Sequence, residues 1–169
     1  MDRSVFLRDD RVALCPVETD DAAFLARVVN DPEVRAGIGT TTPFARHDER
    51  EWIEEGEGTH LLVTADGERV GLIGYEPVEE PWGVAELGYF LDPGAWGNGY
   101  ATAAVELVTT HAFRERRYEK VVAGVYATNP ASARVLEKAG FEREAVLERE
   151  AFRDGERVDL HRYALFADR

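Results

Sequence analysis

Cysteine is nearly absent from this sequence, and long apolar runs are missing altogether. Cys15 is the only cysteine among 169 residues, so no intrachain disulfide can form, which fits a reducing compartment. No run of about 18 apolar residues occurs, so we expect no membrane-spanning helix. The first residues lack a basic stretch followed by an apolar core, so we expect no signal peptide. These absences predict a cytoplasmic protein without a membrane partner.

Lysine is also scarce, occurring only at Lys120 and Lys138, while acidic residues are abundant. Thirty-three acidic residues against 20 basic ones leave a formal net charge of −13. Such a surface repels a phosphate backbone, so we expect no nucleic-acid partner. The acidity fits either the steering of a cationic substrate or a solubilising surface in a salt-rich, halophilic cytoplasm. We favour the second interpretation because the acidic residues are spread along the chain.

The pattern of apolar residues indicates one domain over residues 1–169, since no internal repeat or linker interrupts it. Antiparallel strands come first, followed by a strand–helix–strand–helix unit and a terminal hairpin, which predicts an α+β fold. The predicted strands are residues 12–14, 60–64, 70–76, 84–91, 120–126, 144–152 and 157–166. The predicted helices are one that begins near Thr19, then 32–36, 48–55, 99–113 and 130–138.

A glycine-bearing loop between a predicted strand and a predicted helix is the most informative stretch. It contains Trp96-Gly97-Asn98-Gly99-Tyr100-Ala101-Thr102. Glycine lets a backbone approach a ligand closely, and the first amides of a helix have no partner inside it. Together with the helix dipole they form an anion site suited to a pyrophosphate. A plain strand-to-helix turn would need the same glycines, so the loop alone leaves both interpretations open.

Nucleotide-binding domains need loop residues that are missing here. A P-loop needs Gly-Lys followed by Ser or Thr, which the chain lacks. A dinucleotide fingerprint needs a third glycine where Thr102 stands. Glu119 lies at a suitable separation for a ribose contact, yet it precedes its predicted strand instead of ending one. We therefore disfavour a nucleotide-binding domain.

A second motif follows the next predicted strand. Asn129-Pro130-Ala131-Ser132 begins a helix that ends in Glu137-Lys138-Ala139-Gly140-Phe141. Asparagine is a good N-cap and proline suits the first helical position, so helix capping alone would explain the start of the motif. Two helix N-termini after neighbouring strands could, however, grip one elongated ligand.

Both motifs, in this order and spacing, resemble those of the GNAT superfamily of acetyl-CoA-dependent N-acetyltransferases, and the resemblance covers nearly the whole chain. The second motif is similar to the signature of the branch that acetylates ribosomal-protein N-termini. The resemblance implies a mixed, mostly antiparallel central sheet of about six or seven strands flanked by about four helices. It also implies direct transfer of an acetyl group from acetyl-CoA to a primary amine, on a protein N-terminus or a small molecule, by a monomer or homodimer.

The same resemblance assigns binding roles residue by residue. The backbone of the strand end would pair with the pantetheine arm, the loop amides would hold the pyrophosphate, and Asn129 would hydrogen-bond the pantetheine. Arg134 would pair with a CoA phosphate or, equally well, lie solvated on its helix. The predicted CoA-binding residues are Tyr89, Phe90, Leu91, Trp96, Gly97, Asn98, Gly99, Tyr100, Ala101, Thr102, Asn129, Ser132 and Arg134.

Two residues are predicted to take part in the chemistry. Glu86, on the strand that leads to Leu91, is the candidate base, acting directly or through water, unless it is only a polar residue on a solvent face. An α-amino group titrates near ~7.7–8.0, so a modest base is sufficient. Many members of the superfamily use a helical tyrosine to protonate the leaving thiolate, but Leu136 stands at that place. Ser132 is then left to donate a hydrogen bond to the sulfur.

The missing tyrosine keeps a non-catalytic acyl-CoA-binding or regulatory module as the alternative function. The chain's histidines lack the spacing of metal ligands, so we predict no metal. Trp52 and Trp82 could border the acceptor site, but we expect both to be buried in the packing. The four histidines are His47, His60, His111 and His161.

Overall fold

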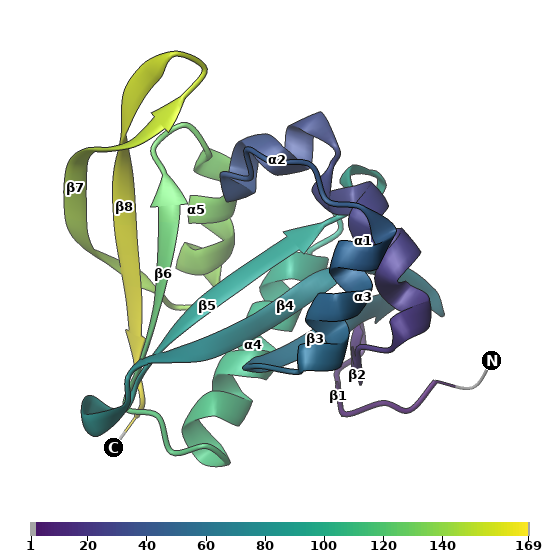
Figure 1. Ribbon diagram of the computed structural model, residues 1–169. Helices are drawn as coiled ribbons and strands as arrows, with labels where there is room; N and C mark the ends of the chain where they lie inside the picture. Colours follow the sequence, from purple (N-terminus) through teal and green to yellow (C-terminus); the bar gives the residue numbers. More distant parts are fainter. Residues whose placement is uncertain (1–2, 169) are drawn as a thin grey trace.

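A twisted eight-stranded sheet forms the centre of the computed structural model, which describes residues 3–168 (Figure 1). The strand order is β1-β2-β3-β4-β5-β6-β8-β7. Neighbouring strands are antiparallel except for the parallel pair β5 and β6. The strands are β1 (Leu7–Arg8), β2 (Ala13–Pro16), β3 (Thr59–Ala65), β4 (Glu68–Glu79), β5 (Val84–Leu91), β6 (Lys120–Tyr126), β7 (Glu142–Arg153) and β8 (Glu156–Phe166).

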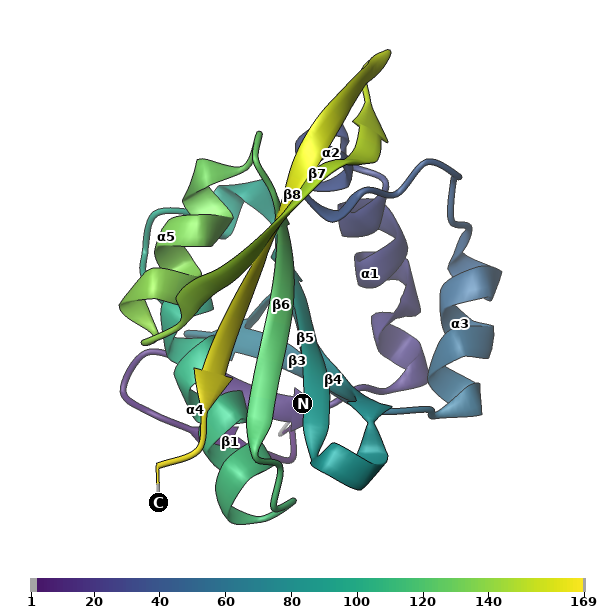
Figure 2. The ribbon, with the colours of Figure 1, turned by 90° about the vertical axis from the view of Figure 1, so that its left-hand side faces the viewer.

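Five α-helices cover the sheet, with α4 and α5 on one face, α1 and α3 on the other, and α2 near one end of the splayed strands (Figures 1 and 2). The predicted α+β fold with a mostly antiparallel sheet is confirmed. The described chain has one strand more than the seven predicted, because the two-residue strand β1 is too short to show a periodic pattern. The helices are α1 (Ala22–Val29), α2 (Pro32–Ile38), α3 (Arg46–Glu55), α4 (Tyr100–Arg114) and α5 (Pro130–Lys138).

Two apolar clusters hold the helices to the sheet. The larger one lies between the sheet and α4 and α5, and it includes Val63, Ile73, Val105 and Leu136. A smaller cluster joins Leu25 of α1 to the opposite face of β3 and β4. Burial of each large aliphatic side chain contributes about 1.5–3 kcal/mol, so these contacts fix the helix positions.

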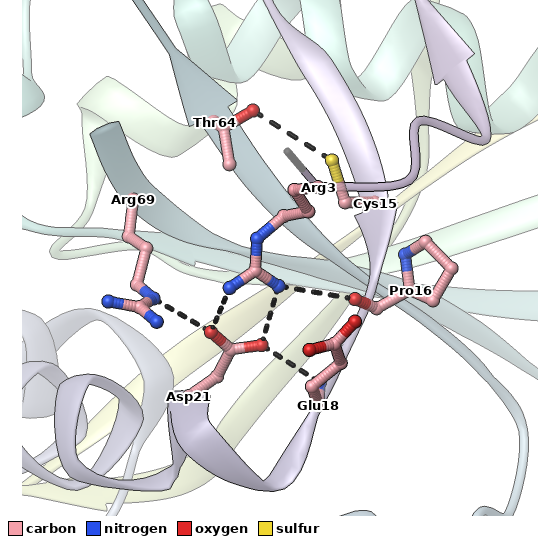
Figure 3. A network of polar contacts seen from close by, with 7 residues as sticks. All are labelled: Arg3, Cys15, Pro16, Glu18, Asp21, Thr64 and Arg69. Carbon is pink, nitrogen blue, oxygen red and sulfur yellow. Dashed lines mark hydrogen bonds and ion pairs between the residues drawn. The ribbon is translucent and has the colours of Figure 1, made fainter. Parts of the chain in front are cut away.

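A buried carboxylate ties the start of the chain to the sheet (Figure 3). Asp21, just before α1, accepts hydrogen bonds from Arg3 at 2.7 and 2.9 Å and from Arg69 of β4 at 2.7 Å. The Asp21 Oδ2 atom, which accepts the 2.9 Å hydrogen bond from Arg3, also accepts one from the Glu18 amide at 2.8 Å. Burial by itself would raise the pKa of Asp21, but these hydrogen bonds outweigh it and hold the pKa below its ordinary value.

The two central strands separate after a short parallel contact. Residues Val84, Ala85 and Glu86 of β5 pair with the start of β6, and the two strands then diverge toward α2 (Figure 1). The rest of β5 stays paired with β4 up to Leu91. The two strands are not paired beyond Glu86, and the region between their diverging ends, here called the cleft, positions the candidate site.

Candidate active site

The unpaired edge of β5 is the first feature of the cleft. In the part of the chain that the structure describes, no strand pairs with this edge beyond Glu86. Tyr89, Phe90 and Leu91, predicted to pair with pantetheine, therefore lie on a stretch with one free edge. Such an edge presents backbone donors and acceptors to another extended chain or ligand.

The loop after β5 presents unpaired amides at the N-terminus of α4. Gly99 is the N-cap residue with φ 77°, and no side chain caps this helix. The first intrahelical hydrogen bond runs from the Ala103 amide to the Gly99 carbonyl, so the amides of Tyr100, Ala101 and Thr102 have no partner within the helix. These amides and the helix dipole make the loop a site for a phosphate group.

Two polar side chains of the loop brace its own backbone. The Trp96 indole nitrogen donates to the Leu91 carbonyl at 3.0 Å. The Asn98 amide nitrogen donates to the Ala95 carbonyl at 3.0 Å and to the Trp96 carbonyl at 3.3 Å. Trp96 and Asn98 therefore shape the cradle, and any ligand contact falls to the loop backbone and to the exposed indole face.

The N-terminus of α5 lies on the other side of the cleft. The Asn129 side-chain oxygen accepts the Ser132 amide at 3.2 Å, as the motif predicts for an N-cap. Its amide nitrogen lies against Gly37 of α2, where a Cβ atom would come within 3.0 Å. The oxygen is thus used for capping, and the nitrogen lies on the side of Asn129 that faces α2. Arg134 is exposed on α5.

Ser132 has a partner that the sequence did not indicate. The Tyr89 hydroxyl lies 2.8 Å from the Ser132 hydroxyl and 3.3 Å from the Ser132 carbonyl. Burial raises the pKa of Tyr89 to about 12, although the hydrogen bond with Ser132 opposes the shift. Sequence reasoning gave Tyr89 only a backbone role, because no local pattern joins residues on β5 and α5. Leu136, at the place of the superfamily's tyrosine, is 1% exposed and packs in the core.

Glu86 is exposed on β5, at the point where two hollows of the sheet meet. The larger hollow, here called the acceptor hollow, has a volume of about 390 Å³ and lies between β3, β4, β5 and the helices α2 and α3. The smaller one, of about 220 Å³, lies over β6 and β8. The side chains and glycines of the acceptor hollow include Trp52, His60, Glu76, Glu86, Gly88 and Phe90.

The expectation that Trp82 is buried is wrong, because its side chain is 70% exposed beyond the end of β4. Trp52 is partly buried and lines the acceptor hollow. Sequence reasoning considered His60 only as a metal ligand and so missed its place in this hollow.

Among the described residues, no group of three or more potential ligands is arranged to hold a metal ion. No helix of residues 3–168 is long and apolar enough to cross a membrane.

Comparisons with known proteins give matches to the sequence and to the fold. A family model described as an acetyltransferase (GNAT) domain matches residues 11–142. An uncharacterized protein of Bacillus subtilis, YkkB, is 33% identical over 83% of this chain and 87% of its own length. The uncharacterized N-acetyltransferase p20 of Bacillus licheniformis is 27% identical over 94% of both chains.

Solved structures of similar fold include two whose substrates are named. A spermidine N-acetyltransferase from Vibrio cholerae in complex with CoA and spermine superposes with a TM-score of 0.85 at 19% identity, covering 94% of this chain and 96% of that one. An acetyltransferase from Salmonella typhimurium modifies the N-terminal serine of ribosomal protein L7/L12. Its structure superposes with a TM-score of 0.82 at 19% identity, covering 95% of this chain and 97% of that one. At this identity the likeness concerns the fold.

Proposed function

The chain belongs to the GNAT family of acetyltransferases and is an N-acetyltransferase, and we propose that it binds acetyl-CoA in the cleft between β5 and β6. One observation carries the proposal: the uncapped N-terminus of α4 follows the free edge of β5, and Tyr89 on that strand contacts Ser132 in the first turn of α5. A cofactor with a pyrophosphate at one end and an amide-bearing arm at the other matches these three features.

The binding roles follow from the groups that remain free. The amides of Tyr100, Ala101 and Thr102 hold the pyrophosphate, and the Thr102 hydroxyl adds a donor. The β5 edge pairs with the pantetheine amides as an added strand would. The Asn129 amide nitrogen donates to the same arm, and the exposed Arg134 guanidinium contacts a CoA phosphate.

The reaction is direct attack of a neutral amine on the thioester carbonyl. Glu86 faces the acceptor hollow and takes the amine proton, directly or through water. A backbone amide near Leu91 stabilises the oxyanion, and the carbon–sulfur bond then breaks. Ser132 donates a hydrogen bond to the departing sulfur, because the buried Leu136 has no hydroxyl to offer.

The acceptor is a primary amine that enters the hollow beside Glu76 and Glu86. Both carboxylates lie on exposed positions of neighbouring strands, directly opposite each other. Like charges in such a pair destabilise a sheet, and an incoming ammonium relieves the repulsion.

Cytoplasmic location, adaptation to salt and a monomeric or dimeric state stay predictions from composition and family.

The test measures binding and turnover separately. Calorimetry with acetyl-CoA at high salt should show binding, and release of the CoA thiol should appear with at least one amine of a panel containing spermine and a peptide with an N-terminal serine. Absence of acetyl-CoA binding contradicts the proposed cleft. Binding without thiol release across the panel supports a non-catalytic acyl-CoA-binding module instead.

A further inference from the structure

Three residues form a row across the sheet at the floor of the acceptor hollow. His60 of β3 pairs with Gly74 of β4, and Gly74 pairs with Gly88 of β5. Directly paired residues point to the same face, so the row runs from an imidazole over two positions without side chains. Two interstrand spacings, about 10 Å, separate the ends of the row. The row ends at β5, the strand along which acetyl-CoA and its thioester are proposed to lie.

The His60 ring extends over the middle of this row. A Cβ atom at Gly74 would lie 2.4 Å from His60 Cδ2, so the ring occupies the space above that glycine. A Cβ atom at Gly88 would meet no atom within 4 Å, so the space above that position is open. The open space of the row therefore lies above Gly88, between the imidazole and the β5 edge.

The ring is held in one orientation. Its Nδ1 atom lies 3.0 Å from the Glu57 carbonyl, and a carbonyl only accepts, so Nδ1 carries a hydrogen. Trp52 of α3 packs edge to face on the ring with 4.8 Å between centroids. Gly58 lies against the carbon between the two ring nitrogens, since a Cβ atom there would come within 2.9 Å of His60 Cε1. An imidazole fixed through one nitrogen presents the other as a proton acceptor.

Two carboxylates line the acceptor hollow together with the ring. His60 Nε2 lies 3.5 Å from a Glu76 carboxylate oxygen on β4. The charged groups that face the ring are Glu76 and, across the hollow on β5, Glu86; the side chain that α3 presents is the uncharged Trp52. The His60 side chain is 20% exposed and Glu76 is 58% exposed, so a proton passed to Glu76 reaches solvent.

We propose that His60 is a general base of the acetyl transfer, placed to take the proton of an amine bound over Gly88. This inference rests on the proposed function. The ammonium gives its first proton to His60 Nε2, directly or through one water, and the freed lone pair attacks the thioester carbonyl. As the tetrahedral intermediate collapses, Glu86 takes the second N–H proton, directly or through water, and the carbon–sulfur bond breaks. The sulfur leaves as thiolate and takes a proton from solvent. His60 and Glu86 then release their protons to water. Imidazole titrates closer to neutral pH than any other side chain, which suits a base at working pH.

The experiment compares His60→Gln with His47→Gln, a matched control on the exposed side of α3. With acetyl-CoA and either spermine or the peptide with an N-terminal serine, His60→Gln should lower kcat/KM about 100-fold, while the control matches wild type. The acid limb of the pH–rate profile, measured over about pH 6 to 9, should change in His60→Gln. The loss should shrink with a weakly basic amine that is neutral at pH 7, because that amine has no ammonium proton for His60 to remove.

A second variant separates a chemical role from a structural one. His60→Ala leaves an open space over Gly58 and Gly74, so added imidazole should restore turnover, and acetyl-CoA affinity by calorimetry should be unchanged. A loss equal for basic and weakly basic amines, or one that imidazole does not restore, overturns the assignment. Full activity of His60→Gln also overturns it while leaving the proposed function intact. If wild type itself acetylates no amine, both fall.

Discussion

The Tyr89 hydroxyl lies 2.8 Å from the Ser132 hydroxyl, and this contact joins β5 to the first turn of α5. Because the pKa of Tyr89 is raised to about 12 by burial, its phenol stays protonated at neutral pH. The shorter of its two contacts is to the Ser132 hydroxyl, not to the carbonyl at 3.3 Å. Either hydroxyl can be the donor of this pair; when Tyr89 donates to the Ser132 hydroxyl, the single hydroxyl hydrogen of the serine is free to point at the leaving sulfur.

This relationship makes Tyr89 a positioning residue for Ser132. We expect Ser132→Ala to lower kcat about tenfold with a smaller effect on acetyl-CoA affinity, because a hydrogen bond to a developing charge contributes about 1.5–3 kcal/mol. Tyr89→Phe should lower kcat less, and the double variant should be no worse than Ser132→Ala. Steady-state kinetics with calorimetry for acetyl-CoA measures both quantities. Tyr118→Phe, outside the cleft, is the control. Additive losses would show that the two hydroxyls act separately.

The sequence predicted much of this site because its motifs are local. The glycines of the loop and the Asn129 cap each act within a few residues, and the structure places them at the starts of α4 and α5. The contact between Tyr89 and Ser132 spans 43 residues, so no local pattern could indicate it. Leu136 is 1% exposed and packs in the core, as is usual for an apolar residue on the inner face of a helix.

Glu86→Gln tests the predicted base. Removing the carboxylate should lower kcat/KM for a strongly basic amine and shift the pH–rate profile, because the amide neither attracts an ammonium nor accepts its proton. A profile measured with spermine at several pH values gives the comparison. Glu106→Gln, on α4 and exposed, is a control for the change in net charge. An unchanged profile would remove Glu86 as a base.

A side chain that fills the space above Gly88 should hinder binding of the amine acceptor without unfolding the sheet. A Cβ atom there meets nothing within 4 Å, and a branched side chain suits a strand. We expect Gly88→Ala to have a small effect on KM for the amine and Gly88→Val a larger one, of about tenfold, since each added methyl group takes space from the substrate. Acetyl-CoA affinity, measured by calorimetry, should stay near wild type. Equal loss of affinity for both substrates would mean that the change disturbs β5 itself.

The fold was predictable where periodicity is strong. Strands such as β3 and β6 and the long helix α4 lie close to their expected bounds, because their apolar residues recur at strand or helix spacing. β1 was missed because two residues carry no period. The row from His60 to Gly88 depends on the register of three strands, and register is set by pairing across the sheet, which one sequence does not show.

The last prediction concerns Asp21, which holds Arg3 and Arg69 at the start of α1. A carboxyl whose pKa is lowered by folding stabilises the protein above its ordinary titration range and loses that contribution as the pH falls through the folded-state pKa. Asp21→Asn should therefore lower the free energy of unfolding at neutral pH by about 3 kcal/mol, the low end for a broken buried ion pair. Denaturant titration should show the gap from wild type narrowing below about pH 4. Asp20→Asn, a substitution at the exposed neighbour, should change the free energy of unfolding little at either pH. If the difference between Asp21→Asn and wild type stays constant with pH, packing at Asp21, not its charge, holds the N-terminal segment.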